Sequence, residues 1–343
     1  QFLPHILHWE DLAELLSEMV GELNASHQGS HFLPSGEHSD RTASLGLYYD
    51  QGYTGPGMKV VEVLPGGPAD IPGSVITPGA IITTVDGKPI PPDTDIHRLL
   101  NRRAGHPMLI SVRLADGNET ASQSIVPITL GQETALAYQR WMNERRTLVD
   151  ELSGGRVGYL HIAGMNLPSY QHVYSELFGR YRHAEAVLVD IRSNGGGNLH
   201  DQLINLLTGS HDSSLVSRHG AEVVRNPVGR FTRHSALLVN ASSYSDASIF
   251  PTLYQTKGIG AIVGEHVPGT GTAVVNDPQI EPRLTYRVPE LGFRLRDGTW
   301  FENLEVVPDI VVYSDPESIA DGRDIQLERA VIHLLEVIGP GAD

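Results

Sequence analysis

The first predicted element is an amphipathic helix near the start of the chain. Between residues 9 and 23 the apolar positions recur at helical spacing with acidic residues between them; they are Leu12, Leu15, Leu16, Met19, Val20 and Leu23. This spacing places the apolar side chains on one face of a helix. We therefore predict a helix over residues 9–23 that stops near Asn24, followed by a polar, glycine-containing loop over residues 25–40.

A second pattern, short apolar runs separated by glycine and proline, covers residues 44–129. In chain order it predicts strand, strand, turn, strand, helix, strand and strand. The turn at residues 85–88 has Asp86-Gly87 at its centre, which is the usual chemistry of a two-residue hairpin. We expect a small β-domain at residues 42–131, followed by a connecting helix over residues 133–152.

From residue 156 to about residue 338, β-branched runs alternate with helical patterns. The predicted strands are residues 156–164, 185–193, 235–243 and 260–266, and the predicted helices are residues 170–184, 198–209 and 246–258. Strands that alternate with helices indicate a largely parallel sheet. Residues 132–343 are therefore expected to form an α/β core.

Composition narrows the classes of function. The formal net charge of −16 argues against nucleic-acid partners, which select for clustered Lys and Arg. No stretch approaches the roughly 20 apolar residues of a membrane-spanning helix, so no membrane partner is expected. There is no cysteine, which excludes a thiolate zinc site and a cysteine nucleophile. Because the chain starts at Gln1 without a signal-peptide pattern, we expect it to be part of a longer protein.

A glycine-rich loop follows the predicted strand that ends near residue 193. Residues 187–198 read VLVDIRSNGGGN, so an apolar strand runs through Asp-x-Arg into three glycines. Glycines in such a loop allow several backbone N–H groups to point at one negative oxygen. The alternative is a strand-to-helix turn without chemistry. A dinucleotide-binding loop is disfavoured because the G-x-G-x-x-G spacing is absent.

A run of small polar residues follows the next strand. Residues 237–250 read LLVNASSYSDASIF, which places hydroxyl groups where a strand ends and a helix begins. An attacking oxygen and a developing oxyanion are both favoured near helix N-terminal N–H groups. The alternative interpretation is helix capping by Ser245 or Asp246.

Together, the glycine loop and the Ser-x-Ser segment about fifty residues later resemble the family of peptidases that includes the tricorn proteases and the C-terminal processing peptidases. The resemblance implies that the second serine of Ser-x-Ser, Ser245, is the nucleophile. It also implies an oxyanion hole made by the N–H of Asp246 and the N–H of one glycine among residues 195–197, for which we favour Gly197.

The resemblance also addresses the general base that a serine nucleophile needs. C-terminal processing peptidases use a lysine, but Thr270 occupies that position here, and Lys257 precedes the strand instead of following it. Tricorn-type members use a histidine in Glu-Leu-Asn-x-Ser-His, and residues 22–27 read Glu-Leu-Asn-Ala-Ser-His. His27 is then the base, and its alternative is a solvated loop histidine. A metal pair of His27 with His31 is disfavoured by Gly29 between them and by the lack of an H-E-x-x-H pattern.

A stretch near the end of the chain resembles the tricorn sequence Glu-Asn-x-Gly-Val-x-Pro-Asp. Residues 302–309 read ENLEVVPD, so Glu302 matches the glutamate that completes a Ser-His-Ser-Glu tetrad, and Ser26 matches its second serine. A carboxylate that acts through a hydroxyl would orient the imidazole. Glu305 replaces the glycine of the pattern, which is a departure in the loop. An acidic hairpin edge is the alternative.

By resemblance, the fold class is α/β: a ClpP/crotonase-like core, an N-terminal helical subdomain at residues 1–41 that bears the histidine, and an inserted PDZ-like domain at residues 42–131. The expected activity is a serine peptidase acting on oligopeptides or unfolded polypeptides, without metal or cofactor. A homo-oligomer, a hexamer by resemblance, and a cytoplasmic location are also expected. Two other classes stay open: a binding scaffold that has lost catalysis, and a PDZ-type peptide-binding adaptor.

Overall fold

The computed structural model describes residues 2–34, 40–92, 94–117, 119–209, 211–226 and 228–341. The chain divides into two compact units, each described by itself below. Unit 1 consists of Gln1–Pro34 and Arg145–Asp343, and unit 2 is Ser35–Glu144. Helix α3 (Leu130–Ser153) runs along the chain from unit 2 into unit 1. No described helix is both long enough and apolar enough to cross a bilayer.

A five-stranded parallel sheet forms the centre of unit 1, in the order β10-β11-β14-β15-β18. The strands are β10 (Val157–His161), β11 (Ala186–Asp190), β14 (His234–Val239), β15 (Ala261–Gly264) and β18 (Ile310–Val311). The first three are buried almost throughout, as expected of parallel strands covered on both faces. The prediction of a largely parallel α/β sheet is confirmed.

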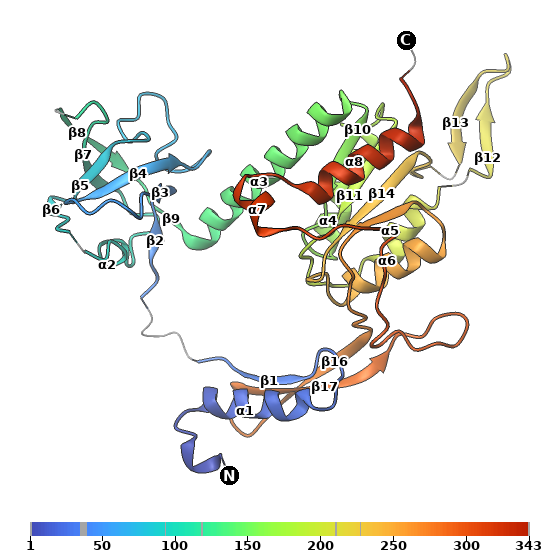
Figure 1. The fold of residues 1–343 in the computed structure, drawn as a ribbon, viewed down its shortest axis with the longest axis horizontal. Coiled ribbons are helices and arrows are strands. Elements are labelled where there is room, and N and C mark those ends of the chain that lie inside the picture. Colours follow the sequence, from blue (N-terminus) through green and yellow to red (C-terminus); the bar gives the residue numbers. More distant parts are fainter. Residues whose placement is uncertain are drawn as a thin grey trace. The chain divides into compact units, whose positions relative to one another are not determined.

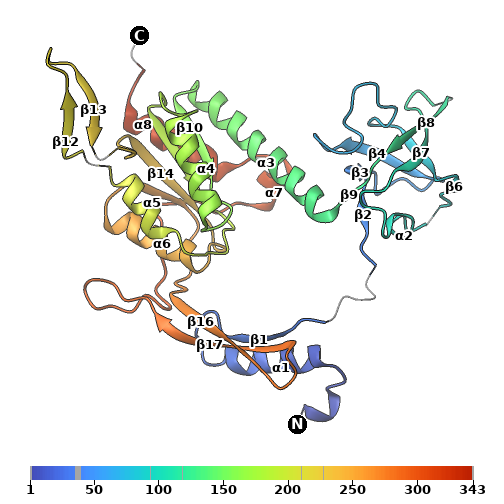
Figure 2. The ribbon, with the colours of Figure 1, turned by 180° about the vertical axis from the view of Figure 1, so that it is seen from behind.

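Helices cover both faces of this sheet. On one face, α4 (Leu167–Phe178), α5 (His200–Leu207) and α6 (Asp246–Thr256) share an apolar core with the sheet, in which Val189 and Leu237 pack with Val173, Leu203 and Phe250. On the other face, α8 (Ile325–Ile338) contacts β14, β11, β15 and β10, while the short α7 (Pro316–Ala320) precedes it (Figures 1 and 2). All strands point the same way, so the loops after β11 and β14 meet at one edge.

A smaller antiparallel sheet of unit 1 combines the two ends of the chain. Its order is β1-β17-β16, with β1 (Gly29–Phe32), β16 (Thr272–Pro278) and β17 (Leu284–Gly292). Figure 1 shows helix α1 (Trp9–Gly21) lying along this sheet, and η1 (Leu3–His5) precedes it. The predicted loop over residues 25–40 is therefore wrong at β1. That strand is mostly polar, and it pairs with β17 through backbone hydrogen bonds, which a pattern of apolar residues does not predict.

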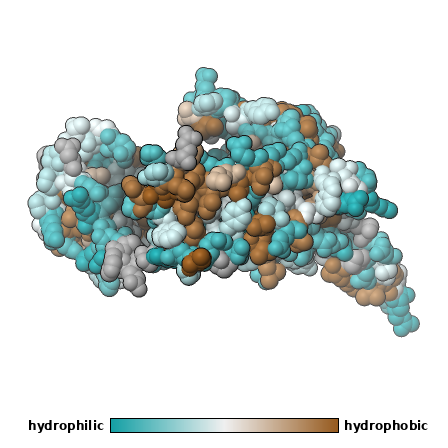
Figure 3. Space-filling view, turned by 90° about the horizontal axis from the view of Figure 1, so that it is seen from below, coloured by the Kyte–Doolittle hydropathy of each residue, from teal (hydrophilic) through white to brown (hydrophobic). Residues whose placement is uncertain are grey.

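Helix α1 confirms the predicted amphipathic helix, which ends at Gly21 rather than near Asn24. Its buried residues are Ala13 and Val20, whereas Met19 is 60% exposed. The three-stranded sheet therefore leaves part of the apolar surface of this helix uncovered. Apolar side chains also gather among polar ones on the surface, as the face shown in Figure 3 illustrates.

Unit 2 is mainly β-structure around its own apolar core. Its main sheet runs β3-β4-β5-β7-β8, with β6 paired to β5 and a separate β2-β9 pair. The bounds are β2 (Ala43–Ser44), β3 (Leu47–Tyr49), β4 (Met58–Val63), β5 (Ile81–Val85), β6 (Lys88–Pro89), β7 (Met108–Arg113), β8 (Thr120–Ile125), β9 (Ile128–Thr129) and α2 (His97–Leu100). The Asp-Gly hairpin is confirmed: Asp86 and Gly87 have φ of 48° and 75°, and the flanking residues pair.

Several elements of the C-terminal part of the chain, among them β16, β17, β18, α7 and α8, were not assigned from sequence, and two local features of other parts also differ from expectation. A hairpin of β12 (Ser213–Val216) and β13 (Glu222–Asn226) follows α5, with its strand residues largely exposed. In unit 2, the predicted helix is shortened to the four residues of α2. Both segments are short, and period-based patterns carry little information at that length.

A buried ionic network lies where β11 runs into the glycine loop. The Arg192 guanidinium donates to Asp190 at 2.6 Å and to both carboxylate oxygens of Asp324 at 2.8 and 2.9 Å. The hydroxyl of Tyr159 donates to Asp190 at 2.9 Å. Burial alone would raise the pKa of Asp190, but Arg192 outweighs it and the pKa is lowered. The stabilisation from this pair is therefore present at neutral pH and is lost as the pH falls through that lowered pKa.

We predict that Arg192→Met lowers the free energy of unfolding by about 3–5 kcal/mol, because the buried carboxylate of Asp190 loses its counter-charge. Asp324 keeps a second partner, Arg145, at 3.2 Å. Urea unfolding followed by circular dichroism measures this loss. Arg323→Met is the matched control, since Arg323 pairs with Glu328 at the exposed surface and its removal should cost far less. Equal losses in the two variants would contradict a structural role of the network.

Candidate active site

Ser245 lies at the turn between β14 and α6, at the carboxyl edge of the parallel sheet. Its backbone has φ 56° and ψ −123°, a conformation that non-glycine residues rarely adopt. The N–H of Ser245 donates to Oγ1 of Thr270 at 2.7 Å, which helps to hold this conformation. A strained strand-to-helix turn of this kind presents the serine hydroxyl at the end of a strand, as in a nucleophile elbow.

The glycine loop packs directly against this turn. A Cβ atom on Gly196 would lie 2.5 Å from the Cβ of Ser245, and one on Gly197 would lie 2.0 Å from the carbonyl oxygen of Met165. Both glycines have positive φ, 99° and 143°. Side chains are therefore excluded at these two positions, and the backbone of the loop can approach Ser245 closely.

Two N–H groups near Ser245 remain available as donors. Within the described residues, neither the N–H of Gly197 nor that of Asp246 donates a hydrogen bond to the protein. Asp246 is the first residue of α6, where N–H groups lack partners inside the helix. The neighbouring N–H of Gly196 is already used, since it donates to the side chain of Asn194 at 2.8 Å. Free N–H groups are what an oxyanion hole needs.

The imidazole of His27 is held on one side by two hydroxyl groups. Its Nδ1 lies 2.9 Å from Oγ of Ser26 and 3.3 Å from Oγ1 of Thr272. The Ser26 hydroxyl donates to Glu302 at 3.0 Å, and the Thr272 hydroxyl donates to the carbonyl oxygen of Ser26 at 2.8 Å. Because the Ser26 hydroxyl donates its one proton to Glu302, Nδ1–H is the donor in the contact between His27 and Ser26. The other ring nitrogen, Nε2, is then unprotonated and can accept a proton.

The carboxylate of Glu302 anchors this arrangement. Besides the Ser26 hydroxyl, it accepts the N–H of Ser26 and, at 2.7 Å, the N–H of Gly271. Its neighbour Phe301 is buried in the core, with 1% of its surface exposed. The next residue, Asn303, donates its N–H to the carbonyl oxygen of Gly269 at 2.9 Å. The carboxylate is therefore fixed from both sides along the chain.

Glu305, the departure from the tricorn-like pattern, takes part in a separate contact. Its carboxylate lies 3.0 Å from Nδ1 of His266. The next residue, Val306, exchanges backbone hydrogen bonds with Val267 at 2.8 and 3.0 Å. The loop thus keeps its pairing with residues 267–269 although a glutamate stands where the pattern has glycine.

The pKa of the His27 imidazole is lowered from its usual value of 6.5. Burial is the main cause, because the charged form loses water; the charge of Glu302 opposes this effect, and Arg287 adds to it slightly. A lowered pKa keeps the ring neutral at neutral pH, the form in which it can accept a proton.

The structure places His27 next to the turn that carries Ser245. Among the described residues, no hydrogen bond joins the side chains of His27 and Ser245. The N–H of His27 donates to the hydroxyl of Tyr244 at 2.8 Å, and the two rings lie 4.6 Å apart between centroids. Tyr244 directly precedes Ser245. His31 is engaged elsewhere, with Thr285 at 2.8 Å, and Lys257 is exposed at the end of α6.

Sequence reasoning missed Tyr244 and Thr272, although both contact His27. Thr270 was noticed only as the residue in the lysine position, while the structure gives it the N–H of Ser245 and a contact of 2.9 Å to the hydroxyl of Ser248. No local pattern marks these residues. The one feature of the sequence that could have indicated these residues is their position, within two or three residues of Ser245 or of Thr270, which occupies the lysine position.

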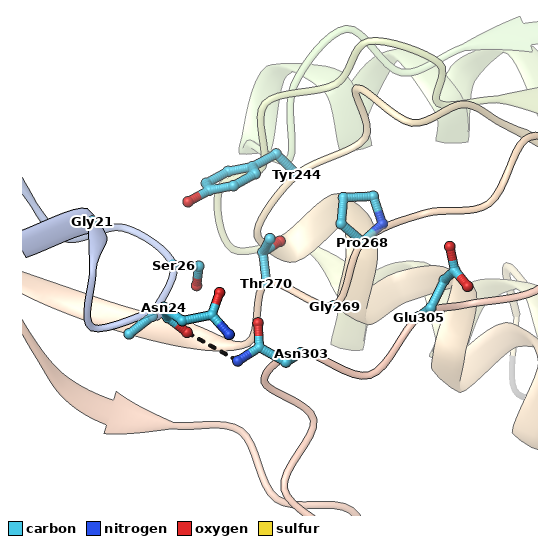
Figure 4. Close-up of a pocket in the computed structure, with 10 residues that line it drawn as sticks. Gly21, Asn24, Ser26, Tyr244, Pro268, Gly269, Thr270, Asn303 and Glu305 are labelled. Atoms are coloured by element: carbon cyan, nitrogen blue, oxygen red, sulfur yellow. Dashed lines mark hydrogen bonds between the residues drawn. The ribbon is translucent and has the colours of Figure 1, made fainter. Parts of the chain in front are cut away.

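A pocket of about 470 Å³ opens beside these residues (Figure 4). It is lined by Ser26 and Tyr244 on one side and by Thr270, Asn303 and Glu305 on the other. Figure 4 shows the hydrogen bond from the Asn303 amide to the carbonyl oxygen of Asn24, 2.9 Å long, which ties the N-terminal segment to the wall of the pocket.

Comparison with known proteins finds similarity to peptidases. Residues 156–312 match the model of peptidase family S41. Tricorn protease homolog 1 of Streptomyces coelicolor is 29% identical over 346 aligned residues, which cover 96% of this chain and 31% of that protein. The tricorn protease homolog of Saccharolobus solfataricus is 27% identical over 338 residues, covering 94% of this chain and 30% of that protein.

The crystal structure of the tricorn protease matches with a TM-score of 0.78 at 22% identity, covering 98% of this chain and 33% of that one. This match shows a shared mixed α/β fold. The chain spans about a third of the length of the curated relatives that it matches. Residues 156–312 thus match peptidase family S41, and over nearly its whole length the chain is similar to the tricorn protease homologues.

Proposed function

We propose that this chain is a serine peptidase that cleaves oligopeptides or unfolded polypeptides through an acyl-enzyme on Ser245. The observation that carries the proposal is the hydrogen-bonded series from Glu302 through Ser26 to Nδ1 of His27, next to the strained turn of Ser245. A binding scaffold has no need of an oriented, neutral imidazole next to the turn that carries Ser245. The proposed catalytic residues are a tetrad of Ser245, His27, Ser26 and Glu302.

In the first half of the reaction, Nε2 of His27 takes the proton of the Ser245 hydroxyl as its oxygen attacks the substrate carbonyl carbon. Active-site hydrogen bonds are often long before substrate binds, so we expect the His27–Ser245 hydrogen bond to form in the complex. Glu302 stabilises the imidazolium through the Ser26 hydroxyl, in the way that a carboxylate does in a triad.

The carbonyl oxygen becomes negative in the tetrahedral intermediate, and the N–H groups of Asp246 and Gly197 are the proposed donors to it. Imidazolium then gives its proton to the leaving amine, and the C–N bond breaks to leave an ester on Ser245. Water attacks this ester with His27 again accepting a proton, which releases the new carboxylate and restores the hydroxyl.

The pocket beside Tyr244 and Thr270 gives room for a substrate chain next to the proposed nucleophile. Both its walls come from segments that also hold the tetrad, the N-terminal segment around Ser26 and the loop around Asn303. A substrate that fills it would contact the same segments that orient His27.

For the fold in finer detail, we propose a ClpP/crotonase-like core and a PDZ-like domain at residues 42–131, between an N-terminal subdomain at residues 1–41 and a core at residues 132–343. Strand order in the β-rich unit and the successive parallel strands of the sheet support these assignments. A hexamer, a cytoplasmic location and the absence of nucleic-acid or membrane partners stay predictions from sequence.

We predict that Ser245→Ala lowers peptide turnover by several orders of magnitude and leaves the fold unchanged, because one hydroxyl is lost. Peptide-library digestion followed by mass spectrometry measures this loss. Ser243→Ala is the matched control: its hydroxyl is buried and donates to the carbonyl oxygen of Ile191, so this variant should still turn over substrate. The reverse result would assign the nucleophile to Ser243, and digestion unaffected by either change would favour the scaffold or adaptor function.

We also predict that kcat/KM rises with pH through a single group whose pKa lies below 6.5, since His27 must be neutral to act and its pKa is lowered. The rate should fall by roughly 10²- to 10⁴-fold in His27→Ala. In Glu302→Gln, loss of the charge that raises this pKa should move the acid limb to still lower pH and reduce the plateau rate.

The exposed Glu290 of β17 offers a matched control for the second variant. Glu290→Gln should leave the acid limb where it is. An acid limb that stays in place in Glu302→Gln would contradict the proposed role of Glu302. A rate that survives in His27→Ala and depends on Lys257 would replace the proposed mechanism by a Ser–Lys mechanism.

A further inference from the structure

The side chain of Asp246 reaches from α6 to the start of α5. Its Oδ2 accepts the N–H of Leu199 at 2.5 Å and the N–H of His200 at 3.1 Å. Leu199 is the N-cap residue of α5 and has no side-chain cap of its own. The carboxylate of Asp246, with 3% of the residue exposed, therefore supplies the missing cap from another helix.

This contact links the two proposed oxyanion donors. Asp246 offers its own backbone N–H, and its carboxylate holds Leu199, which lies two residues after Gly197. The distance between the two donors is thus constrained by one side chain. Donors of an oxyanion are effective only when their positions are fixed before the charge develops.

His200 completes the contact from the solvent side. Its Nδ1 is hydrogen-bonded to Oδ1 of Asp246, and its side chain is 22% exposed. The ring meets Phe293 edge-on, with 5.8 Å between centroids. The charged groups that act on it are Asp246 from α6 and Asp201 beside it in α5. Among the described groups bound to the Asp246 carboxylate, the imidazole is the one whose charge changes near neutral pH.

We propose that His200 is a positioning residue: with Asp246 it forms a clamp that sets the spacing of the two oxyanion donors, and the imidazolium form holds this clamp more tightly than the neutral ring. The inference rests on the proposed peptidase function. It assigns no contact between His200 and substrate. Attraction between opposite charges at hydrogen-bond distance and partial burial exceeds a neutral hydrogen bond, which is the physical reason for the difference between the two forms.

The pKa of His200 supports this assignment. The hydrogen bond to Asp246 raises it above the usual 6.5, against the opposing effect of burial, and the nearby carboxylates add to the rise. A raised pKa means that the tight form exists at lower pH and is lost as pH rises through the raised value. His27 and His200 have pKa values shifted in opposite directions. The rate should therefore be highest in the window between them.

The test measures kcat and KM against pH for the full chain, for His200→Asn and for His234→Asn. An Asn amide can take the place of Nδ1–H but carries no charge at any pH. We expect the wild-type kcat to fall on the alkaline side by roughly tenfold, a moderate cost for misplaced donors. His200→Asn should show this low kcat at all pH values above the acid limb, with KM unchanged. His234 begins β14, at the strand end opposite Ser245, so His234→Asn should follow the wild type.

An alkaline fall that persists in His200→Asn, or a change confined to KM, would overturn the inference. If this variant does not fold, His200→Gln serves in the same measurement. Labelling of Ser245 by a fluorophosphonate separates this failure from a failure of the proposed function. A wild-type protein that labels and cleaves but shows no dependence on His200 rejects the clamp alone. A wild-type protein that neither labels nor cleaves rejects the peptidase.

Discussion

One carboxylate holds the site together. Glu302 accepts the N–H and the hydroxyl of Ser26, from a segment 276 positions away in the chain, and the N–H of Gly271. Without it, the N-terminal segment would lose one of its anchors on the core, and the Ser26 hydroxyl would lose the partner that fixes its proton. The direction of that proton determines which nitrogen of His27 is free. The position of the N-terminal segment and the protonation of His27 thus depend on the same three hydrogen bonds to Glu302.

The strained residues of unit 1 are concentrated where this chemistry is proposed. Ser245 and His27 have φ of 56° and 66°, and Gly196 and Gly197 occupy positions that no side chain could fill. Such conformations cost free energy and persist because surrounding contacts enforce them. Here those contacts are the bond from the N–H of Ser245 to Thr270 and the bond from the N–H of His27 to Tyr244. Local backbone strain and side-chain hydrogen bonds therefore form one system.

Features that depend on local sequence were predictable. The helix at residues 9–21, the parallel strands and the Asp86-Gly87 turn follow from periodicity and turn chemistry, which act over a few residues. Strand β1 was missed because its mostly polar residues pair through backbone groups with β17, more than 250 positions away. Tyr244, Thr272 and His200 were missed for a related reason: their roles exist only once distant segments meet.

The proposed reaction depends on the activation of Ser245 as a nucleophile by His27. Incubation of the intact chain with a fluorophosphonate, followed by peptide mapping, tests it most directly, because the reagent forms a covalent adduct with an activated serine. We predict a single adduct on Ser245, formed at a rate that rises with pH through a pKa below 6.5, and its near-complete loss in His27→Ala. An adduct on another serine, or labelling of Ser245 at an undiminished rate in His27→Ala, would contradict it.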